Sequence, residues 1–279
     1  MKLCTVTHNA QRHAAIVIDD AVVFIKTVND VLAQNFPNDV YALVNIHTID
    51  QLRAIEPQLA TLEQIALCDV QLETPYDTPA HIFSIGMNYQ EKLADLQAER
   101  SEEPVVFMKP NSTIASIHGG LQLPAASKVV SAEGELALII GKVCHRVCEE
   151  EAMDYVSAYT TSLDLTAKDI HAKNPRFLQL SKVFPTFFSF GPMLVTADEI
   201  ENLQHVRVQS VHNGTVVHEN TIDHMMYSPA YIVSYISQFV ELQVGDVIMT
   251  GTPGSFVIQS GDEATCIISS VAQLQQSVY

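Results

Sequence analysis

The chain has 279 residues, of which 47% are hydrophobic, and a formal net charge of −17 with only 15 lysine and arginine residues. This charge opposes binding to nucleic acid or to an anionic membrane, because both need clustered positive charge. No stretch approaches the roughly 20 apolar residues that span a bilayer, and the first residues lack the apolar core of a secretory signal. We therefore expect a cytosolic protein. Its five scattered cysteines predict reduced thiols rather than a disulfide framework.

Residues 1–72 are typical of a small β-rich N-terminal domain. Two short β-branched runs, 14–18 and 21–25, flank Asp19 and Asp20 and predict a hairpin. Weakly amphipathic segments near 39–45 and 49–67 predict helices. Residues 73–80 contain two prolines and no periodic pattern, which indicates a linker.

Residues 81–279 show many short apolar runs separated by Gly, Pro and Asn turns. The expected strands are 82–85, 105–108, 136–140, 206–211, 247–249 and 264–269, and the expected helices are 149–159 and 229–239. Asn213-Gly214 between two apolar runs predicts a tight hairpin turn. We predict a mixed α+β fold, mainly β, with one large C-terminal domain.

Glu133-Gly134-Glu135 heads the apolar run 136–140 and places two carboxylates at the mouth of a predicted strand. Side chains two apart point to the same side of a strand. Ionised carboxylates that close repel each other, so they need a shared proton, a cation or open solvent. Taken by itself, this motif is more often a solvated strand end than a metal site.

Asp164 supplies a third carboxylate, between Leu163 and Leu165. A buried carboxylate there must meet a cation or hydrogen-bond donors, because an unpaired one is costly to bury. The alternative is that Asp164 caps the start of a helix. Two glutamates and one aspartate would form an all-oxygen site that suits Mg²⁺, Mn²⁺ or Ca²⁺ rather than zinc.

An ordered series of segments resembles the fumarylacetoacetate hydrolase (FAH) family over nearly the whole predicted C-terminal domain. The segments are 85–89, 106–110, 133–142, 164–169, Lys182, Gly191-Pro192, Asn213-Gly214, 245–248 and 250–253. One such match would mean little, but this number of matches in order is specific. The resemblance implies an FAH-type β-rich C-terminal domain, preceded by a small β-rich domain as in shorter members.

The resemblance also implies a divalent ion, Mg²⁺ with Mn²⁺ or Ca²⁺ as alternatives, held by Glu133, Glu135 and Asp164. It implies a small 2-oxo or 1,3-dicarbonyl acid as substrate, and a homodimer. A divalent ion chelated by such an acid polarises the carbonyl and stabilises the enolate that forms when a C–C or C–H bond breaks.

Further residues match substrate-site positions of the family. Lys182 matches a lysine close to metal and substrate, and its apolar surroundings in the sequence disfavour a solvated lysine. Lys109 matches a substrate-side lysine, although at a strand end it is equally a surface residue. Lys168 replaces the usual arginine, which keeps the charge but loses the bidentate fork. Gly251 and Thr252 match a substrate-contacting loop, although the residues alone indicate only a turn.

The main departure from the family lies at Lys92 and Asp95, where hydrolytic and decarboxylating members usually carry a histidine and a glutamate. Lysine acts as a base only if its pKa falls by several units, and Asp95 reaches less far than glutamate. This segment is otherwise an ordinary charged helix face. No other histidine has a positional claim to replace the base; His118 is the nearest in sequence, and Gly119-Gly120 after it indicates a loop.

Three functions remain open. We predict first the metal-dependent hydrolysis of a C–C bond of the acylpyruvate or fumarylacetoacetate type. The alternative is an isomerase, tautomerase or decarboxylase, since these reactions need no water nucleophile and the histidine–glutamate pair is replaced. The second alternative is a metal- and ligand-binding protein with little catalytic activity, which a turnover assay would distinguish.

Overall fold

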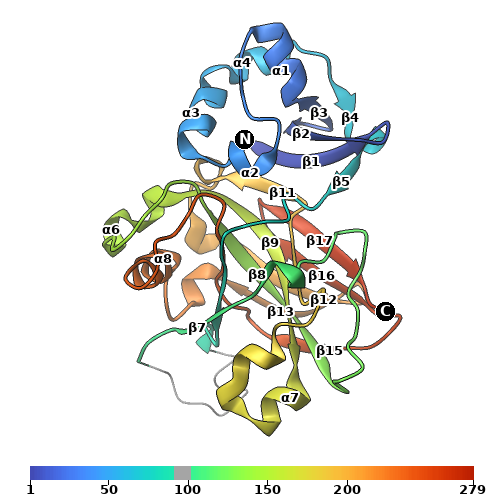
Figure 1. Cartoon of the computed structure of the whole chain (residues 1–279), viewed down its shortest axis with the longest axis vertical. Coiled ribbons are helices and arrows are strands. Elements are labelled where there is room, and N and C mark those ends of the chain that lie inside the picture. The colour runs from blue at the N-terminus through green and yellow to red at the C-terminus, as the bar shows by residue number, and fades with distance from the viewer. Residues whose placement is uncertain (91–101) are drawn as a thin grey trace.

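The computed structural model describes residues 1–90 and 102–279 and has a large mixed sheet at its centre (Figure 1). The strands of this sheet follow the order β4-β3-β2-β1-β11-β9-β8-β14-β6-β7, with β5, β10 and β15 paired to β1, β9 and β8. A second sheet has the order β13-β12-β16-β17. The predicted mixed fold with strands in the majority is confirmed.

The N-terminal strands and helices lie at one end of the molecule (Figure 1). The elements are β1 (Lys2–His8), β2 (Gln11–Ile18), β3 (Ala21–Phe24), α1 (Ile25–Leu32), α2 (Val40–Leu43), α3 (Ile46–Ala54), α4 (Glu56–Leu59), β4 (Ile65–Ala66), η1 (Leu67–Asp69) and β5 (Gln71–Glu73). The predicted hairpin is confirmed, since β2 and β3 pair with Ile18 opposite Ala21.

The long helix expected over 49–67 is divided, and its second part ends at Leu59, before strand β4. Helix α3 ends at Ala54 and α4 begins at Glu56, with Pro57 in its first turn. Proline lacks the N–H that a continuing helix would need, which explains the break. Helix α1 was not expected, because the apolar run to Ile25 is typical of a strand, whereas the strand ends at Phe24.

The N-terminal strands continue into the central sheet, because β1 pairs with β2 on one side and with β11 (Met193–Thr196) on the other. Leu3 and Ile16 share one core with Ala137 and Ile139 of β8. The division into residues 1–72, a linker 73–80 and residues 81–279 stays a prediction.

The rest of the central sheet contains two long strands, β8 and β9, and the shorter strands around them. These strands are β6 (Ile82–Gly86), β7 (Val105–Met108), β8 (Val130–Ile140), β9 (Val156–Ala167), β10 (Phe188–Phe190), β11, β14 (Val247–Met249) and β15 (Ser255–Ile258). The second sheet contains β12 (Arg207–His212), β13 (Thr215–Thr221), β16 (Glu263–Ile268) and β17 (Ala272–Ser277). Asn213 and Gly214, both with positive φ, form the predicted hairpin turn between β12 and β13.

The other helices are short. They are η2 (Asn111–Thr113), α6 (Glu149–Ala152), η3 (Met153–Tyr155), α7 (Lys168–Lys173), η4 (Pro175–Ser181), η5 (Ala197–Glu199), η6 (Leu203–His205), η7 (Ile222–His224) and α8 (Pro229–Ser237). The helix expected over 149–159 is therefore too long: β9 begins at Val156, because this segment pairs with β8. None of the helices in the described ranges is both long and apolar enough to cross a membrane.

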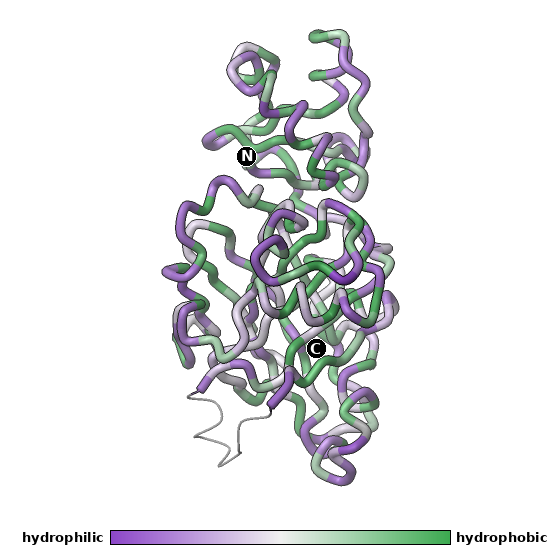
Figure 2. The backbone as a smooth tube through the Cα atoms, turned by 90° about the vertical axis from the view of Figure 1, so that its left-hand side faces the viewer, coloured by the Kyte–Doolittle hydropathy of each residue, from purple (hydrophilic) through white to green (hydrophobic). Residues whose placement is uncertain are grey.

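Strands β8 and β9 are buried along their whole length. Leu136, Leu138 and Ile140 on one face of β8 join a core that includes Val208 of β12 and Cys266 of β16, so this face packs against the second sheet. In Figure 2 the hydrophobic stretches gather in the interior, with hydrophilic turns outside them. The opposite face of β8 carries the acidic motif.

Candidate metal and substrate site

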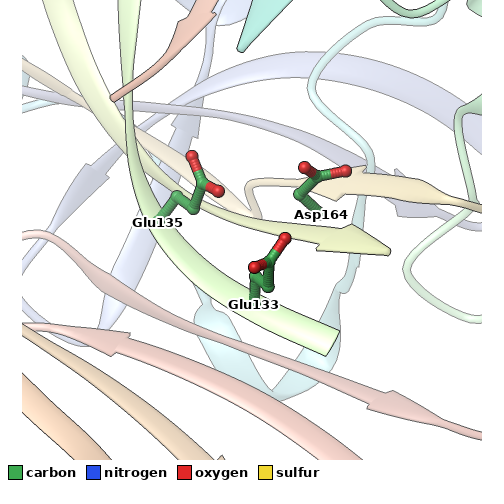
Figure 3. Close-up of side chains that lie close together, drawn as sticks. All are labelled: Glu133, Glu135 and Asp164. Carbon is green, nitrogen blue, oxygen red and sulfur yellow. The ribbon is translucent and has the colours of Figure 1, made fainter. Parts of the chain in front are cut away.

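The register between β8 and β9 brings the three carboxylates together. Glu133 lies directly opposite Asp164, and Glu135 lies opposite Ser162. Directly opposed residues of antiparallel strands share a face, as do residues two apart on one strand. One carboxylate oxygen from each of Glu133, Glu135 and Asp164 lies within 4.8 Å of the other two (Figure 3).

The motif lies inside β8 and is not a strand end, which corrects the expectation from sequence. The strand begins at Val130, and Glu133 and Glu135 are only 6% and 2% exposed. The solvated alternative is therefore wrong. The alternative of a helix cap at Asp164 is also wrong, because β9 continues to Ala167 before α7 begins.

Gly134 is required by the opposite face of β8. A Cβ atom there would lie 2.9 Å from Ser210 Oγ and 3.2 Å from Cys266 Sγ on the second sheet. The Gly134 N–H also donates to Ser210 Oγ at 3.1 Å. The glycine lets the second sheet approach closely while its two neighbours point the other way.

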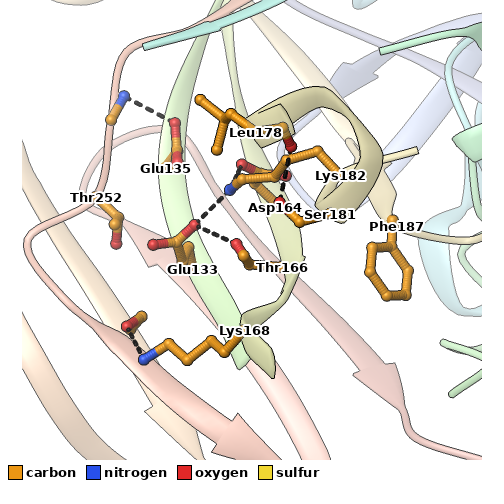
Figure 4. A network of polar contacts seen from close by, with 12 residues as sticks. Glu133, Glu135, Asp164, Thr166, Lys168, Leu178, Ser181, Lys182, Phe187 and Thr252 are labelled. Carbon is orange, nitrogen blue, oxygen red and sulfur yellow. Dashed lines mark hydrogen bonds and ion pairs between the residues drawn. The ribbon is translucent and has the colours of Figure 1, made fainter. Parts of the chain in front are cut away.

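Two buried lysines, Lys182 and Lys109, balance part of the negative charge, and Figure 4 shows the first of them. Lys182 Nζ, just after η4, donates to Glu133 Oε2 at 2.8 Å and to Asp164 Oδ2 at 2.5 Å. Lys109 Nζ, just after β7, lies 2.7 Å from Asp164 Oδ1 and donates to the carbonyls of Lys182 and Phe187. Lys109 is 3% exposed, so the interpretation as a surface residue is wrong.

The pKa values of the two lysines shift in opposite directions, although both side chains lie beside Asp164. Burial lowers the pKa of Lys109 to about 8, since Asp164 offsets the burial only in part and Lys182 adds repulsion. Burial also acts to lower the pKa of Lys182, but Asp164 and Glu133 together outweigh it and raise that pKa. Lys182 is therefore the more firmly held cation of the pair.

Glu135 is held by the loop at Gly251, and the segment at Asn88 fixes this loop. Both segments are among those that resemble the family. Glu135 Oε2 accepts the Gly251 N–H at 2.7 Å. Gly251 has a φ of +98°, and a Cβ atom there would lie 2.7 Å from Asn88 Cβ. Asn88 is buried, and its amide donates to the carbonyls of Thr250 and Tyr227. The matching segments around Asn88 and Gly251 therefore meet in space and position Glu135.

A cavity of about 410 Å³ opens in front of the carboxylates. Its polar lining includes Lys168, whose Nζ donates to Ser255 Oγ at 3.0 Å, and Thr166, whose hydroxyl donates to Glu133. Apolar residues complete the walls: Ile85, Met87, Val105, Phe107, Pro175 and Leu178. Lys182 reaches the carboxylates from one side, with Lys168 beyond Glu133 on the other (Figure 4).

The cavity gathers some of the residues expected from sequence and leaves others aside. Five of them line it: Glu133, Glu135, Asp164, Lys168 and Lys182. Lys109, Gly251 and Thr252 are buried and do not line it, and Thr252 Oγ1 donates to the carbonyl of Gly254. Lys92 and Asp95 lie outside the described residues, so their expected catalytic role stays a prediction.

His171 is a lining residue that the sequence did not single out. His118, considered instead, is exposed and contacts the carbonyl of Leu72. The sequence held one usable signal, since His171 lies three positions after Lys168 and residues at this spacing share a helix face. Ser255 was also missed, because nothing in its own segment indicates that it lies opposite Glu133.

The carboxylate group fits a hard divalent ion. Ligands on opposite sides of an ion with metal–oxygen distances of about 2.0–2.6 Å lie roughly 4–5 Å apart, and the three oxygens here are within 4.8 Å of one another. All three donors are oxygens on strands, and each is buried. Mg²⁺, Mn²⁺ and Ca²⁺ all suit such a donor set.

Residues 81–279 match the family model described as fumarylacetoacetate (FAA) hydrolase C-terminal. This match covers well over half of the chain. The chain belongs to the fumarylacetoacetate hydrolase family. The resemblance recognised in the sequence is thus confirmed over residues 81–279.

Named relatives within the FAH family fall into more than one reaction class. Oxaloacetate tautomerase fahd2, mitochondrial, from Xenopus laevis is 33% identical over 75% of this chain and 69% of its own length. Oxaloacetate tautomerase Fahd2a, mitochondrial, from Rattus norvegicus is 30% identical over 78% and 72%. The solved structure of maleylpyruvate hydrolase from Sphingobium sp. SYK-6, in complex with manganese(II) and pyruvate, is 26% identical, with a TM-score of 0.81 over 100% of this chain and 98% of that one.

Proposed function

We propose that this chain is a divalent-metal-dependent enzyme that interconverts the keto and enol forms of a small 2-oxo acid such as oxaloacetate. The observation that carries the proposal is the buried group of Glu133, Glu135 and Asp164, which faces a cavity of about 410 Å³. The names of the two tautomerase relatives support the choice of reaction.

Glu133, Glu135 and Asp164 are the proposed ligands of the ion. A bound divalent ion supplies a Lewis acid that attracts electron density from the 2-oxo group. Lys182 and Lys109 hold the carboxylates in place, because their ammonium groups contact Glu133 and both oxygens of Asp164. Lys182 also lines the cavity, from which it can reach a bound acid, so we assign it a catalytic role.

The formal charges explain why an acidic chain can take an anionic substrate. Among the residues the structure describes, three carboxylates against the ammonium groups of Lys109 and Lys182 leave −1, a charge that repels a 2-oxo acid. A divalent ion reverses the sign, and Lys168 adds a further positive charge at the wall. We assign Lys168 and Ser255 to the substrate's carboxylate end, and Phe107 and Leu178 to the exclusion of water from its carbon chain.

Hydrolysis of a C–C bond is the second candidate, and the likeness to maleylpyruvate hydrolase along the whole chain favours it. It needs a water nucleophile and a base to activate it. Lys92 and Asp95 are the predicted replacements for the family's usual pair, and we keep them as proposed catalytic residues. Decarboxylation, and ligand binding with little turnover, remain predictions that the same assays address.

The test compares wild type with Glu135→Gln. Glutamine keeps a carbonyl oxygen for the Gly251 N–H but loses the negative charge. We expect wild type to accelerate the decay of enolic oxaloacetate absorbance when Mg²⁺ or Mn²⁺ is present and to lose this activity with EDTA. The variant should fold, bind Mn²⁺ at least tenfold more weakly by calorimetry, and lose the activity. Metal-independent turnover, or unchanged Mn²⁺ affinity in the variant, would refute the proposal.

Acylpyruvate and maleylpyruvate serve as parallel substrates in the same assay. Metal-dependent cleavage of either, without acceleration of oxaloacetate tautomerisation, would select hydrolysis instead. The homodimer is a prediction that light scattering during gel filtration checks. The cytosolic location is also a prediction, and the two named relatives are described as mitochondrial.

A further inference from the structure

His171 is the one imidazole that lines the cavity among the residues the structure describes. It lies on α7, which begins directly after β9, the strand that carries Asp164. Lys168 and His171 are three residues apart on this helix and share the face toward the cavity. His171 therefore belongs to the same site as the carboxylates without being one of the proposed ligands.

Helix α7 is fastened so that this histidine is held in place. The carboxylate of Asp169 accepts a hydrogen bond from Ser127 Oγ at 2.5 Å and from the Lys128 N–H at 3.0 Å. The Lys168 N–H donates to the carbonyl of Val129 at 2.8 Å. These contacts tie α7 to the segment immediately before β8, which fixes His171 in relation to the acidic motif.

We propose that His171 is the acid–base residue that moves the proton between the enol and keto forms of the bound 2-oxo acid. The inference rests on the proposed function and deepens it. The neutral imidazole takes the enol hydroxyl proton while the O–H electron pair becomes part of the new C=O bond. The electron pair of the C=C bond then takes the proton back at C3, so the histidine ends neutral and one proton has moved.

The surroundings of His171 support this role. Burial, and then the charge of Lys182, lower its pKa below the ordinary value, while Glu133 opposes the shift. The imidazole is therefore neutral at pH 7 and available as a base. In the part of the chain that the structure describes, the other charged groups that line the cavity with it are Glu135, Asp164 and Lys168. The competing explanation is that His171 only packs against the substrate or donates a hydrogen bond to it.

The test uses His171→Gln, since glutamine preserves size and hydrogen bonding but cannot carry a proton. The first assay follows, by proton NMR, the exchange of the C3 hydrogens of pyruvate in D₂O. Its buffer contains Mg²⁺ and no Mn²⁺. The second assay follows the decay of enolic oxaloacetate. We expect kcat and the exchange rate to fall by about 10²–10⁴-fold, the usual contribution of a general acid–base group. KM and Mn²⁺ affinity, the latter measured separately, should stay within threefold.

Two controls separate proton transfer from position. His118→Gln removes an exposed imidazole outside the cavity and should leave the exchange unchanged. His171→Ala should regain part of its activity with added imidazole. Exchange within threefold of wild type in His171→Gln would overturn the assignment, as would a parallel loss of Mn²⁺ affinity. Absence of metal-dependent exchange in wild type would instead refute the proposed function.

Discussion

Replacing Lys182 with methionine tests the charge balance of the site. The side chain keeps its approximate length, but the ammonium that contacts both Glu133 and Asp164 is lost. Removing one partner of a buried ion pair costs about 3–5 kcal/mol, because the remaining charge is left uncompensated. For a chain near this size, about 2 °C in Tm per kcal/mol converts that loss into a fall of roughly 6–10 °C.

The loss of stability in Lys182→Met should be smaller when the metal ion is bound. Loss of the Lys182 ammonium changes the formal charge of the group made by the three carboxylates, Lys109 and residue 182 from −1 to −2. A divalent ion should then bind more tightly than in wild type. At a free ion concentration of 100 Kd, binding stabilises a folded protein by about 2.7 kcal/mol. The stability difference between variant and wild type should therefore shrink in Mn²⁺.

Urea denaturation with EDTA and with saturating Mn²⁺ measures both effects, and a tautomerase assay follows catalysis. Lys128→Met is the matched control, since Lys128 is exposed and the same substitution should change stability by less than about 0.5 kcal/mol. A deficit below about 1 kcal/mol in EDTA would show that Lys182 does not neutralise buried charge. An equal deficit with and without Mn²⁺ would show that the ion does not occupy these carboxylates.

Three further substitutions test the supports of the site and the second sheet. Asn88→Ala should cost about 1–3 kcal/mol by leaving buried backbone groups unpaired, and it should weaken Mn²⁺ binding through Gly251, which denaturation and calorimetry would show. Gly134→Ala should destabilise by about 1–3 kcal/mol through overpacking against Ser210, measured by urea denaturation. Hydrogen bonds from neighbouring side chains lower the pKa of Asp262 to about 2. The stability that ionised Asp262 contributes is present above pH 4 and is lost as the pH falls toward 2. The stability difference between wild type and Asp262→Asn should therefore shrink over that range.

The sequence predicted which carboxylates form the acidic group better than it predicted their place in the two paired strands. The period-two alternation of strand side chains places Glu133 and Glu135 on one side without any knowledge of the fold. The position of Asp164 opposite Glu133 depends on the β8–β9 register, which pairs residues 31 positions apart. A residue-by-residue interpretation therefore left a solvated strand end and a helix cap open, and only the pairing removes them.

The burial of Lys109 and the place of His171 at the cavity show why the rest was out of reach. Lys109 follows an ordinary short strand, and its burial comes from Asp164 and from the carbonyls of Lys182 and Phe187, which are all distant in the sequence. His171 lies on a six-residue helix whose direction over the site depends on the anchoring of Asp169 to Ser127. Apart from the three-residue spacing between Lys168 and His171, such contacts between separate segments leave no local pattern in the sequence.

The net charge of the chain and the charge inside its cavity point to an ordered binding sequence. A chain at −17 repels an anionic acid at long range, and within residues 1–90 and 102–279 the lysines at the site are Lys109, Lys168 and Lys182. Their charges equal those of the three carboxylates, so these six side chains together attract an anion once a divalent ion is added. The ion should therefore bind first, and oxalate, which resembles the reacting end of a 2-oxo acid, should show no measurable binding in EDTA.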